Sequence, residues 1–136
     1  MIGTNPDWDH FISTHRWAVL TTLRNTGSPV SSVVAYARRA DLLIVSTPGT
    51  TFKRESLARD PRANLCVISD QQPFNFVALE GRCDILTEQL EDDTLRVFDN
   101  IEDTGYKPPA DLSAWIEQQQ RVILEFAIDR VYGVIR

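Results

Sequence analysis

The sequence has few of the residues that hydrolases and metalloproteins commonly use. Its 136 residues include two histidines, His10 and His15, and two cysteines, Cys66 and Cys83. On a helix the two histidines would point about 140° apart, so they form no metal-binding pair. The cysteines stand alone in apolar segments, which is typical of buried free thiols. No H-E-x-x-H or G-x-S-x-G motif and no complete P-loop occurs, which argues against a metal site and a hydrolase.

Long hydrophobic runs and basic stripes are also missing. The longest purely aliphatic run covers residues 42–45, far short of the roughly 20 residues that cross a bilayer. The first residues lack the basic and apolar regions of a secretory signal, so the expected location is the cytoplasm. The net charge is −5, and the acids gather in residues 88–103. We therefore expect neither nucleic acid nor membrane as a partner.

The composition that is present is typical of a globular protein. Hydrophobic residues make up 43% and charged residues 24%, and the length predicts one domain over residues 1–136. Apolar alternation predicts strands over residues 16–24, 29–38, 41–47, 62–69, 74–86, 121–128 and 129–135. Helices are expected after Asn5, from Thr50 or Thr51 to Arg59, after Thr87 and from Asp111. Six or seven antiparallel strands with three or four short helices predict a mainly β (α+β) fold, a small closed barrel.

One short string has the chemistry of an anion site. The sequence PGTTFKRE, residues 48–55, stands where a predicted strand turns into a helix. Backbone N–H groups at a helix N-terminus attract anions, and Lys53 in the same turn adds the positive charge that a phosphate needs. An ordinary helix cap beside a solvated lysine would have the same sequence, so the residues alone leave both interpretations open.

Five pieces of the chain, taken in order, point to a known family. They are LTTL at 20–23, Ser28-Pro29 before a strand ending at Tyr36, a strand and polar loop leading to Lys53, LARDPRA at 57–63, and VALEGR at 77–82 followed by RVIL at 121–124 and RVYG at 130–133. This pattern resembles the pyridoxamine-5′-phosphate-oxidase-like superfamily of split β-barrel flavin and deazaflavin oxidoreductases, over nearly the whole chain. The short length and the ending most resemble the branch that uses coenzyme F-420, a deazaflavin.

The resemblance implies a split β-barrel homodimer with cofactor sites at the subunit interface. It also implies an F-420-dependent oxidoreductase that transfers a hydride between the cofactor and a small conjugated molecule. The positions that match cofactor-binding residues of relatives are Lys53, Thr51 and Thr50 for the phosphate, Ser46 and Thr47 beside the ring and ribityl chain, Val30, Ser32 and Val33 along the ring, and Phe74, with Phe76, toward the neighbouring subunit's cofactor. Core or dimer packing is the alternative role for the two phenylalanines.

The sequence departs from the family pattern at several positions. Many relatives carry an arginine where this chain has Thr51, and Val30 and Val33 are apolar where relatives are polar. Two other functions therefore stay open: an FMN-binding flavin reductase or oxidase on the same scaffold, and a non-catalytic carrier of a flavin, deazaflavin or tetrapyrrole. No spacing singles out a proton donor among the tyrosines and Lys53, so no catalytic residue is assigned.

Overall fold

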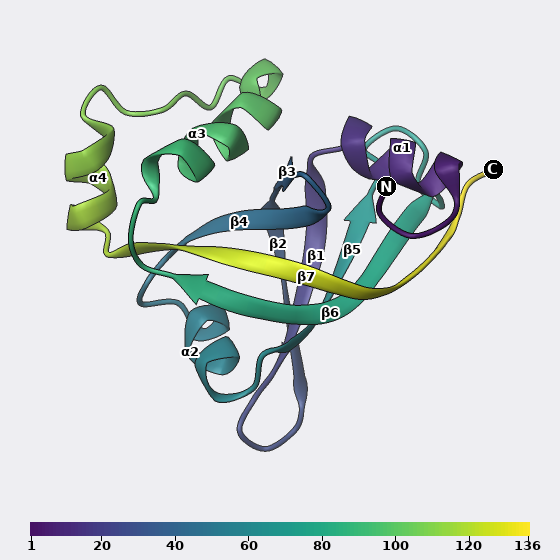
Figure 1. Cartoon of the computed structure of the whole chain (residues 1–136), viewed down its shortest axis with the longest axis horizontal. Coiled ribbons are helices and arrows are strands. Elements are labelled where there is room, and N and C mark those ends of the chain that lie inside the picture. Colours follow the sequence, from purple (N-terminus) through teal and green to yellow (C-terminus); the bar gives the residue numbers. More distant parts are fainter.

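Seven strands form one antiparallel sheet that curls on itself in the computed structural model, which describes residues 1–136 (Figure 1). The strands are β1 (Trp17–Leu23), β2 (Pro29–Ala35), β3 (Ala37–Arg39), β4 (Leu42–Pro48), β5 (Arg62–Ile68), β6 (Phe76–Leu86) and β7 (Arg121–Val134). Their order in the sheet is β2-β1-β5-β6-β7-β4-β3. The expected mainly β split-barrel fold with seven strands and four α-helices is confirmed.

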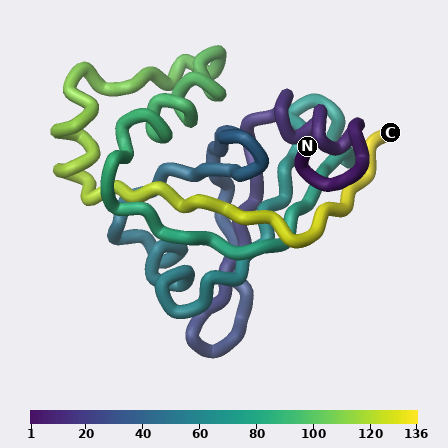
Figure 2. The backbone as a smooth tube through the Cα atoms, in the orientation of Figure 1, coloured from purple at the N-terminus to yellow at the C-terminus, as the bar shows by residue number.

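Two of the helices pack against the main core, and the other two cover the outer face of the sheet. They are α1 (Pro6–Thr14), α2 (Phe52–Arg59), α3 (Glu91–Asn100) and α4 (Leu112–Gln118), with a 3-10 turn η1 (Glu102–Thr104). Helices α1 and α2 contribute Phe11, Ile12 and Leu57 to the main core. Helices α3 and α4 cover β3, β4 and β7 from outside, and Figure 2 shows this segment extending from one end of the sheet. None of the helices is both long and apolar enough to cross a bilayer.

Strand alternation decides which side chains face the core. Successive side chains on a strand point to opposite faces of the sheet, so Leu43 and Val45 of β4 reach the main core while Ile44 lies outside, under α3 and α4. The same rule places Val122 inside and Ile123 outside on β7. An inner and an outer face can therefore be assigned to every residue of these strands.

A single bent strand forms both edges of the sheet. Strand β2 pairs with β1 and strand β3 pairs with β4, yet only Tyr36 separates them. The Tyr36 side chain is fully buried, and its hydroxyl donates to the Ile12 carbonyl at 2.6 Å. The sequence predicts one strand over residues 29–38 in a closed barrel, and this was wrong. The bend at Tyr36 directs the two halves to different partners, which leaves the barrel split.

The split opens between β2 and β4. Continuing the β3–β4 register back through Tyr36 would set Ala35 opposite Ser46 and Val33 opposite Pro48. Those pairs do not form, because β2 pairs with β1 instead. The two strands still approach each other. Ser46 and the turn after Pro48 therefore lie on one side of the split and the end of β2 on the other.

Several local predictions can be checked against the structure. The Asn5 side chain caps α1 by accepting from Asp7 N and Trp8 N, and the register shifts at Glu80/Gly81, so the predicted cap and bulge are confirmed. The predicted cap at Thr87 is wrong, because α3 begins at Glu91. The strands predicted over 121–128 and 129–135 are one continuous β7, because β6 is long enough to pair along it.

The two cysteines are free thiols on neighbouring strands. Cys83 is buried and Cys66 is half-buried. Burial raises the pKa of Cys66 above its ordinary value and that of Cys83 to about 12, so neither forms much thiolate at neutral pH. The predicted burial is confirmed for Cys83, whereas Cys66 is only half-buried.

Candidate functional site

The strand-to-helix turn predicted from PGTTFKRE is present. Strand β4 ends at Pro48, and α2 begins at Phe52 with Thr51 in the N-cap position. Gly49 packs so closely against β7 that an added Cβ would lie 2.3 Å from the Gln120 carbonyl oxygen. Glycine is therefore needed here to bring the turn against the start of β7.

The first N–H groups of α2 have no acceptor within the protein. Thr51 is the N-cap residue, but its side chain makes no cap hydrogen bond. Its hydroxyl instead donates to the Pro48 carbonyl at 3.1 Å and lies 3.2 Å from the Thr47 hydroxyl. Thr51 thus closes the turn, and the uncapped end of α2 is left for an acceptor from outside.

Ser46 and Thr47 of β4 point in opposite directions. Thr47 is buried (1% exposed) on the inner face, where it supports the turn through Thr51. Ser46 is half-buried on the outer face, and its hydroxyl oxygen accepts from Arg121 Nε at 3.1 Å. Of these two predicted site residues, only Ser46 lies on the face that carries Arg121.

Arg121 is held in place by three neighbours. Besides its bond to Ser46, its Nη1 donates to Gln119 Oε1 at 2.7 Å, and its guanidinium lies 4.2 Å from the centroid of the Trp115 ring. Burial lowers the pKa of Arg121. Burial also lowers the pKa of Lys53, and the charge of Arg121 lowers it further.

The cations around this turn differ from the other half-buried cations of the chain. Arg16, Arg38 and Arg39 are half-buried, and each forms ion pairs with carboxylates. The remaining half-buried cations, Lys53, Arg54 and Arg121, form none. Buried charges are ordinarily paired. Three unpaired cations at one place therefore indicate a site for an anionic ligand.

A cleft of about 560 Å³ adjoins the turn. Gly49, Arg54 and Arg121 line it, together with residues from the start of α3 and from α4. Arg54 Nε is buried and has no hydrogen-bond partner in the protein, although the residue itself lines the cleft. Arg54, which follows Lys53, thus reaches the side of the turn that faces the cleft.

The predicted residues of β2 fall on two faces. Val30 and Ser32 share the inner face with the core residue Val34, whereas Val33 is on the outer face and is 66% exposed. Val30 lines a separate small hollow of about 190 Å³ with Phe52 of α2. The structure therefore brings Val33, but not Val30 or Ser32, to the face that also carries Ser46.

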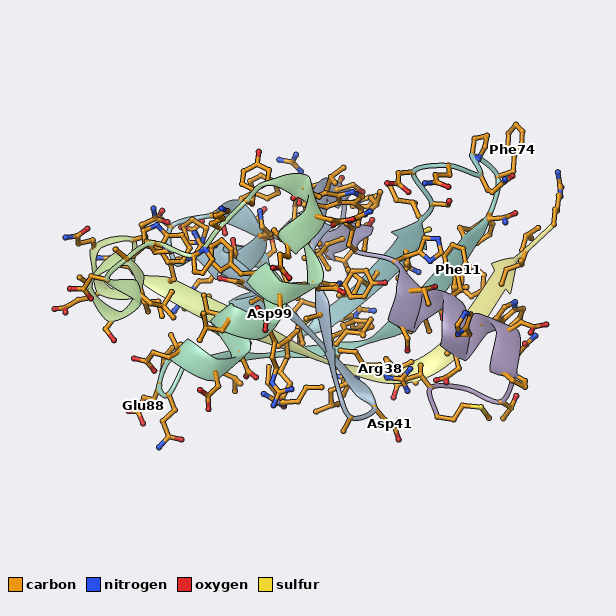
Figure 3. The ribbon with its side chains drawn as sticks, turned by 90° about the horizontal axis from the view of Figure 1, so that it is seen from above. Phe11, Arg38, Asp41, Phe74, Glu88 and Asp99 are labelled. Carbon is orange, nitrogen blue, oxygen red and sulfur yellow. The ribbon has the colours of Figure 1, made fainter.

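Phe74 lies far from the turn within the same chain. It is 72% exposed in the loop between β5 and β6, with the Arg136 guanidinium 5.9 Å from its ring centroid. In Figure 3 the Phe74 side chain is at the opposite end of the molecule from Glu88, which is near the cleft. Phe76 is half-buried on the sheet and meets Tyr132 edge to face. Neither phenylalanine reaches the turn of its own chain.

The tyrosines considered as proton donors differ in access. Tyr36 is buried, burial raises its pKa, and its hydroxyl is bonded to the Ile12 carbonyl, so it has a structural role. Tyr106 and Tyr132 are exposed, and the Tyr132 hydroxyl accepts from Asn64 Nδ2 at 3.2 Å. None of these three contacts the turn.

The sequence analysis did not single out Arg121 as a site residue. Arg121 lies 68 positions after Lys53, and only the pairing of β4 with β7 brings it opposite Pro48. The one indication in the sequence was that Arg121 stands at the start of an apolar strand. A charged residue at that position indicates that this end of the strand faces a polar environment.

The chain belongs to the family described as pyridoxamine 5'-phosphate oxidase, which it matches over residues 4–135. The family is one of flavin-binding split barrels, as the sequence resemblance implied. A search of the curated proteins found no match to this chain.

Solved structures share the fold at low sequence identity. An F420 reductase is 18% identical, with a TM-score of 0.77 over 95% of this chain and 98% of that one. A conserved hypothetical protein from Mycobacterium tuberculosis, Rv2991, is 20% identical, with a TM-score of 0.78 over 98% of this chain and 85% of that one. A FAD-binding protein from Mesorhizobium loti is 20% identical, with a TM-score of 0.70 over 96% and 94%. At these identities the likeness concerns the fold alone.

Proposed function

We propose that this protein is an oxidoreductase that binds a phosphate-bearing deazaflavin, coenzyme F-420, with FMN as the second candidate. The observation that carries the proposal is the group of three half-buried cations without acidic partners at the turn between β4 and α2. Membership of the flavin-binding family supports a flavin-type ligand. The fold shared with an F420 reductase supports the deazaflavin.

The residues at the turn fit a phosphate. The phosphate of FMN is a monoester with close to two negative charges at neutral pH, and that of coenzyme F-420 is a diester with one. The turn offers either of them the charge of Lys53 together with the uncapped N–H groups of α2. Charge-assisted bonds of this kind are the strong ones in proteins. Thr50 is exposed beside them and is free to donate its hydroxyl to the same ligand.

The split of the barrel is the proposed place for the ring. Val33 and Ser46 stand on the two sides of the split on the outer face, adjoining the phosphate turn. A flat apolar ring would lie against Val33, while Ser46 offers a hydroxyl at its edge. Thr47, Val30 and Ser32 face inward and would support the site from behind.

The chain's own part in the reaction is to bind, orient and exclude water. When bound, the reduced cofactor supplies a hydride to a conjugated small molecule. No side chain at the turn or the split is a positioned acid or base, since Tyr36 is committed to Ile12. Solvent is therefore the proposed source of the proton.

A second copy of the chain is proposed to complete the site. Phe74 is too far from the turn of its own chain to contact a ligand there, yet it is 72% exposed. In a homodimer with two-fold symmetry, each copy would offer its Phe74 to the other's site. We propose that the copies meet through the outer face of the sheet, along the row of paired residues Val33, Val19, Cys66, Ala78 and Tyr132.

Titration of the purified protein tests the cofactor. Binding is measured by the change in tryptophan fluorescence, and we expect coenzyme F-420 to bind more tightly than FMN. Lys53→Ala should weaken binding by about ten- to a hundred-fold, because it removes one charge-assisted hydrogen bond. Lys107→Ala, which removes an exposed lysine in the loop before α4, is the matched control. Hydride transfer to a panel of conjugated acceptors is then assayed with the cofactor that binds.

The outcomes separate the candidate functions. Tighter binding of FMN than of F-420 would replace the deazaflavin by a flavin. Binding without turnover over the whole panel would indicate a carrier, a role that the fold shared with a FAD-binding protein also supports. Unchanged binding by Lys53→Ala would mean that the turn is only the start of a helix.

A further inference from the structure

We propose that Arg121, positioned by Trp115, is the second cation that binds the cofactor phosphate. The inference rests on the proposed function, because it assigns a further residue to the same ligand. It concerns a residue at the far end of the sequence from the turn, on the strand that pairs with β4.

Arg121 is placed beside the turn by the sheet. It is the first residue of β7 and stands opposite Pro48, the last residue of β4. It lies on the outer face together with Ser46, to which its Nε donates at 3.1 Å. The anion would thus be approached by Lys53 from the helix and by Arg121 from the sheet.

The guanidinium is oriented before any ligand arrives. Trp115 of α4 lies 4.2 Å from it, Ser46 holds Nε and Gln119 holds Nη1 at 2.7 Å. Nη2 makes no hydrogen bond within the protein. A planar guanidinium fixed on one ring face presents its free edge in a defined direction, which favours recognition of an oxyanion.

Arg121 forms no ion pair with a carboxylate of the chain. The half-buried Arg16, Arg38 and Arg39 all meet carboxylates, and each ties two or more elements together. Arg121 meets none, and it lines the cleft together with Arg54, which also forms no ion pair. Two like charges held together without a counter-ion are unfavourable, and an oxyanion between them would turn this repulsion into attraction.

Comparison of ligands with and without the phosphate tests the proposal. FMN and riboflavin differ only in that group, so this pair isolates the contribution of the phosphate. Calorimetric titration gives the dissociation constants for wild type, Arg121→Gln, Arg121→Lys, Trp115→Phe and the control Lys107→Gln. Thermal unfolding and circular dichroism establish that each variant is folded.

We expect Arg121→Gln to weaken binding of the phosphorylated ligand by about ten- to a hundred-fold and to leave the phosphate-free ligand unchanged. Arg121→Lys should keep most of the preference for the phosphorylated ligand, because it keeps the charge. Trp115→Phe should lose part of it, because a smaller ring fixes the guanidinium less well. A purely structural role for Arg121 would instead weaken both ligands equally, and that result would overturn the inference.

Lys53→Gln distinguishes failure of this inference from failure of the proposed function. If Lys53→Gln loses the phosphate preference and Arg121→Gln retains it, the turn is the phosphate site and Arg121 is not part of it. If wild type binds none of the phosphorylated ligands, the proposed function fails and this assignment fails with it.

Discussion

Lys53, Arg54 and Arg121 carry charge that the chain itself does not balance. Side chains of this kind usually stay in water or find a carboxylate, and the other half-buried arginines of this protein do the latter. Keeping three unpaired cations half-buried lowers the stability of the free protein. Such a loss is common where a residue serves a ligand rather than the fold.

Replacing Lys53 by methionine should therefore stabilise the free protein while weakening cofactor binding. We expect Lys53→Met to raise the free energy of unfolding at pH 7 by roughly 0.5–1 kcal/mol, measured by urea titration without ligand. The same change at the exposed Lys107 should leave it within about 0.5 kcal/mol of wild type. A Lys53→Met protein less stable than wild type would mean that the contact of the ammonium group with the Phe52 ring, 5.7 Å from the ring centroid, outweighs the cost of its burial.

The pH dependence of this effect has a definite sign. Burial and Arg121 lower the pKa of Lys53 in the folded state below its usual 10.5, so the unfolded chain holds the proton more tightly. The penalty is then complete at neutral pH, begins to fall as the pH rises through the folded pKa, and is gone above the unfolded pKa of about 10.5. The stability difference between Lys53→Met and wild type should accordingly shrink in that alkaline range.

Residues within one local string were predictable, and residues brought in by distant pairing were not. Lys53 was found because a glycine, two threonines and a lysine stand next to a predicted helix start. Arg121 was missed because its place depends on the β4–β7 register, which no local pattern specifies. Strand alternation could have separated Val33 from Val30 and Ser32, since neighbouring residues of a strand face opposite sides.

At the level of elements, the position of the strand-to-helix turn depends on its close packing against β7.

The strands and helices themselves were largely predictable from alternation and caps, but the bend at Tyr36 was not. Residues 29–38 were predicted as one strand because they form one unbroken stretch rich in valine and serine. The two halves separate because β2 pairs with β1 and β3 pairs with β4.

Gly49→Ala tests how the turn is held. The added Cβ would lie 2.3 Å from the Gln120 carbonyl oxygen, so the backbone must move away from β7. We expect a loss of about 1–3 kcal/mol in unfolding free energy, together with weaker cofactor binding because Lys53 moves away from Arg121. Thr50→Ala, at the exposed neighbouring position, is the control and should change stability by less than about 0.5 kcal/mol. Wild-type stability and affinity in Gly49→Ala would show that the close packing is dispensable.

At the level of the whole molecule, the outer face of the sheet is covered on one part only. Helices α3 and α4 pack on β3, β4 and β7. Farther along the sheet, one row of paired residues crosses five strands on the outer face: Val33, Val19, Cys66, Ala78 and Tyr132. Val33 is 66% exposed and Tyr132 38% exposed at its two ends. A row of apolar residues of this kind, with exposed side chains at both ends, favours contact with another protein surface.

We predict that this face joins two copies of the chain and that Val33→Asp separates them. Light scattering at tens of micromolar should give about twice the chain mass of 15.4 kDa for wild type and the single-chain mass for Val33→Asp. The fold should be retained, because an exposed side chain is replaced. Leu95→Asp, on the exposed surface of α3 (37% exposed), should stay dimeric. A wild-type mass near 15.4 kDa would contradict both the dimer and the shared site.

The bent strand through Tyr36 also bears on aggregation. An open sheet normally exposes an unpaired strand at each edge, and such edges are templates for adding strands of other molecules. Here both edges belong to one chain segment: β3 has only three residues, and β2 begins with a proline that cannot donate a hydrogen bond. The same bend brings β2 near β4, so the two edges approach each other. The bend at Tyr36, which opens the proposed ligand site, thus also disfavours the addition of strands from other molecules to the edges of this sheet.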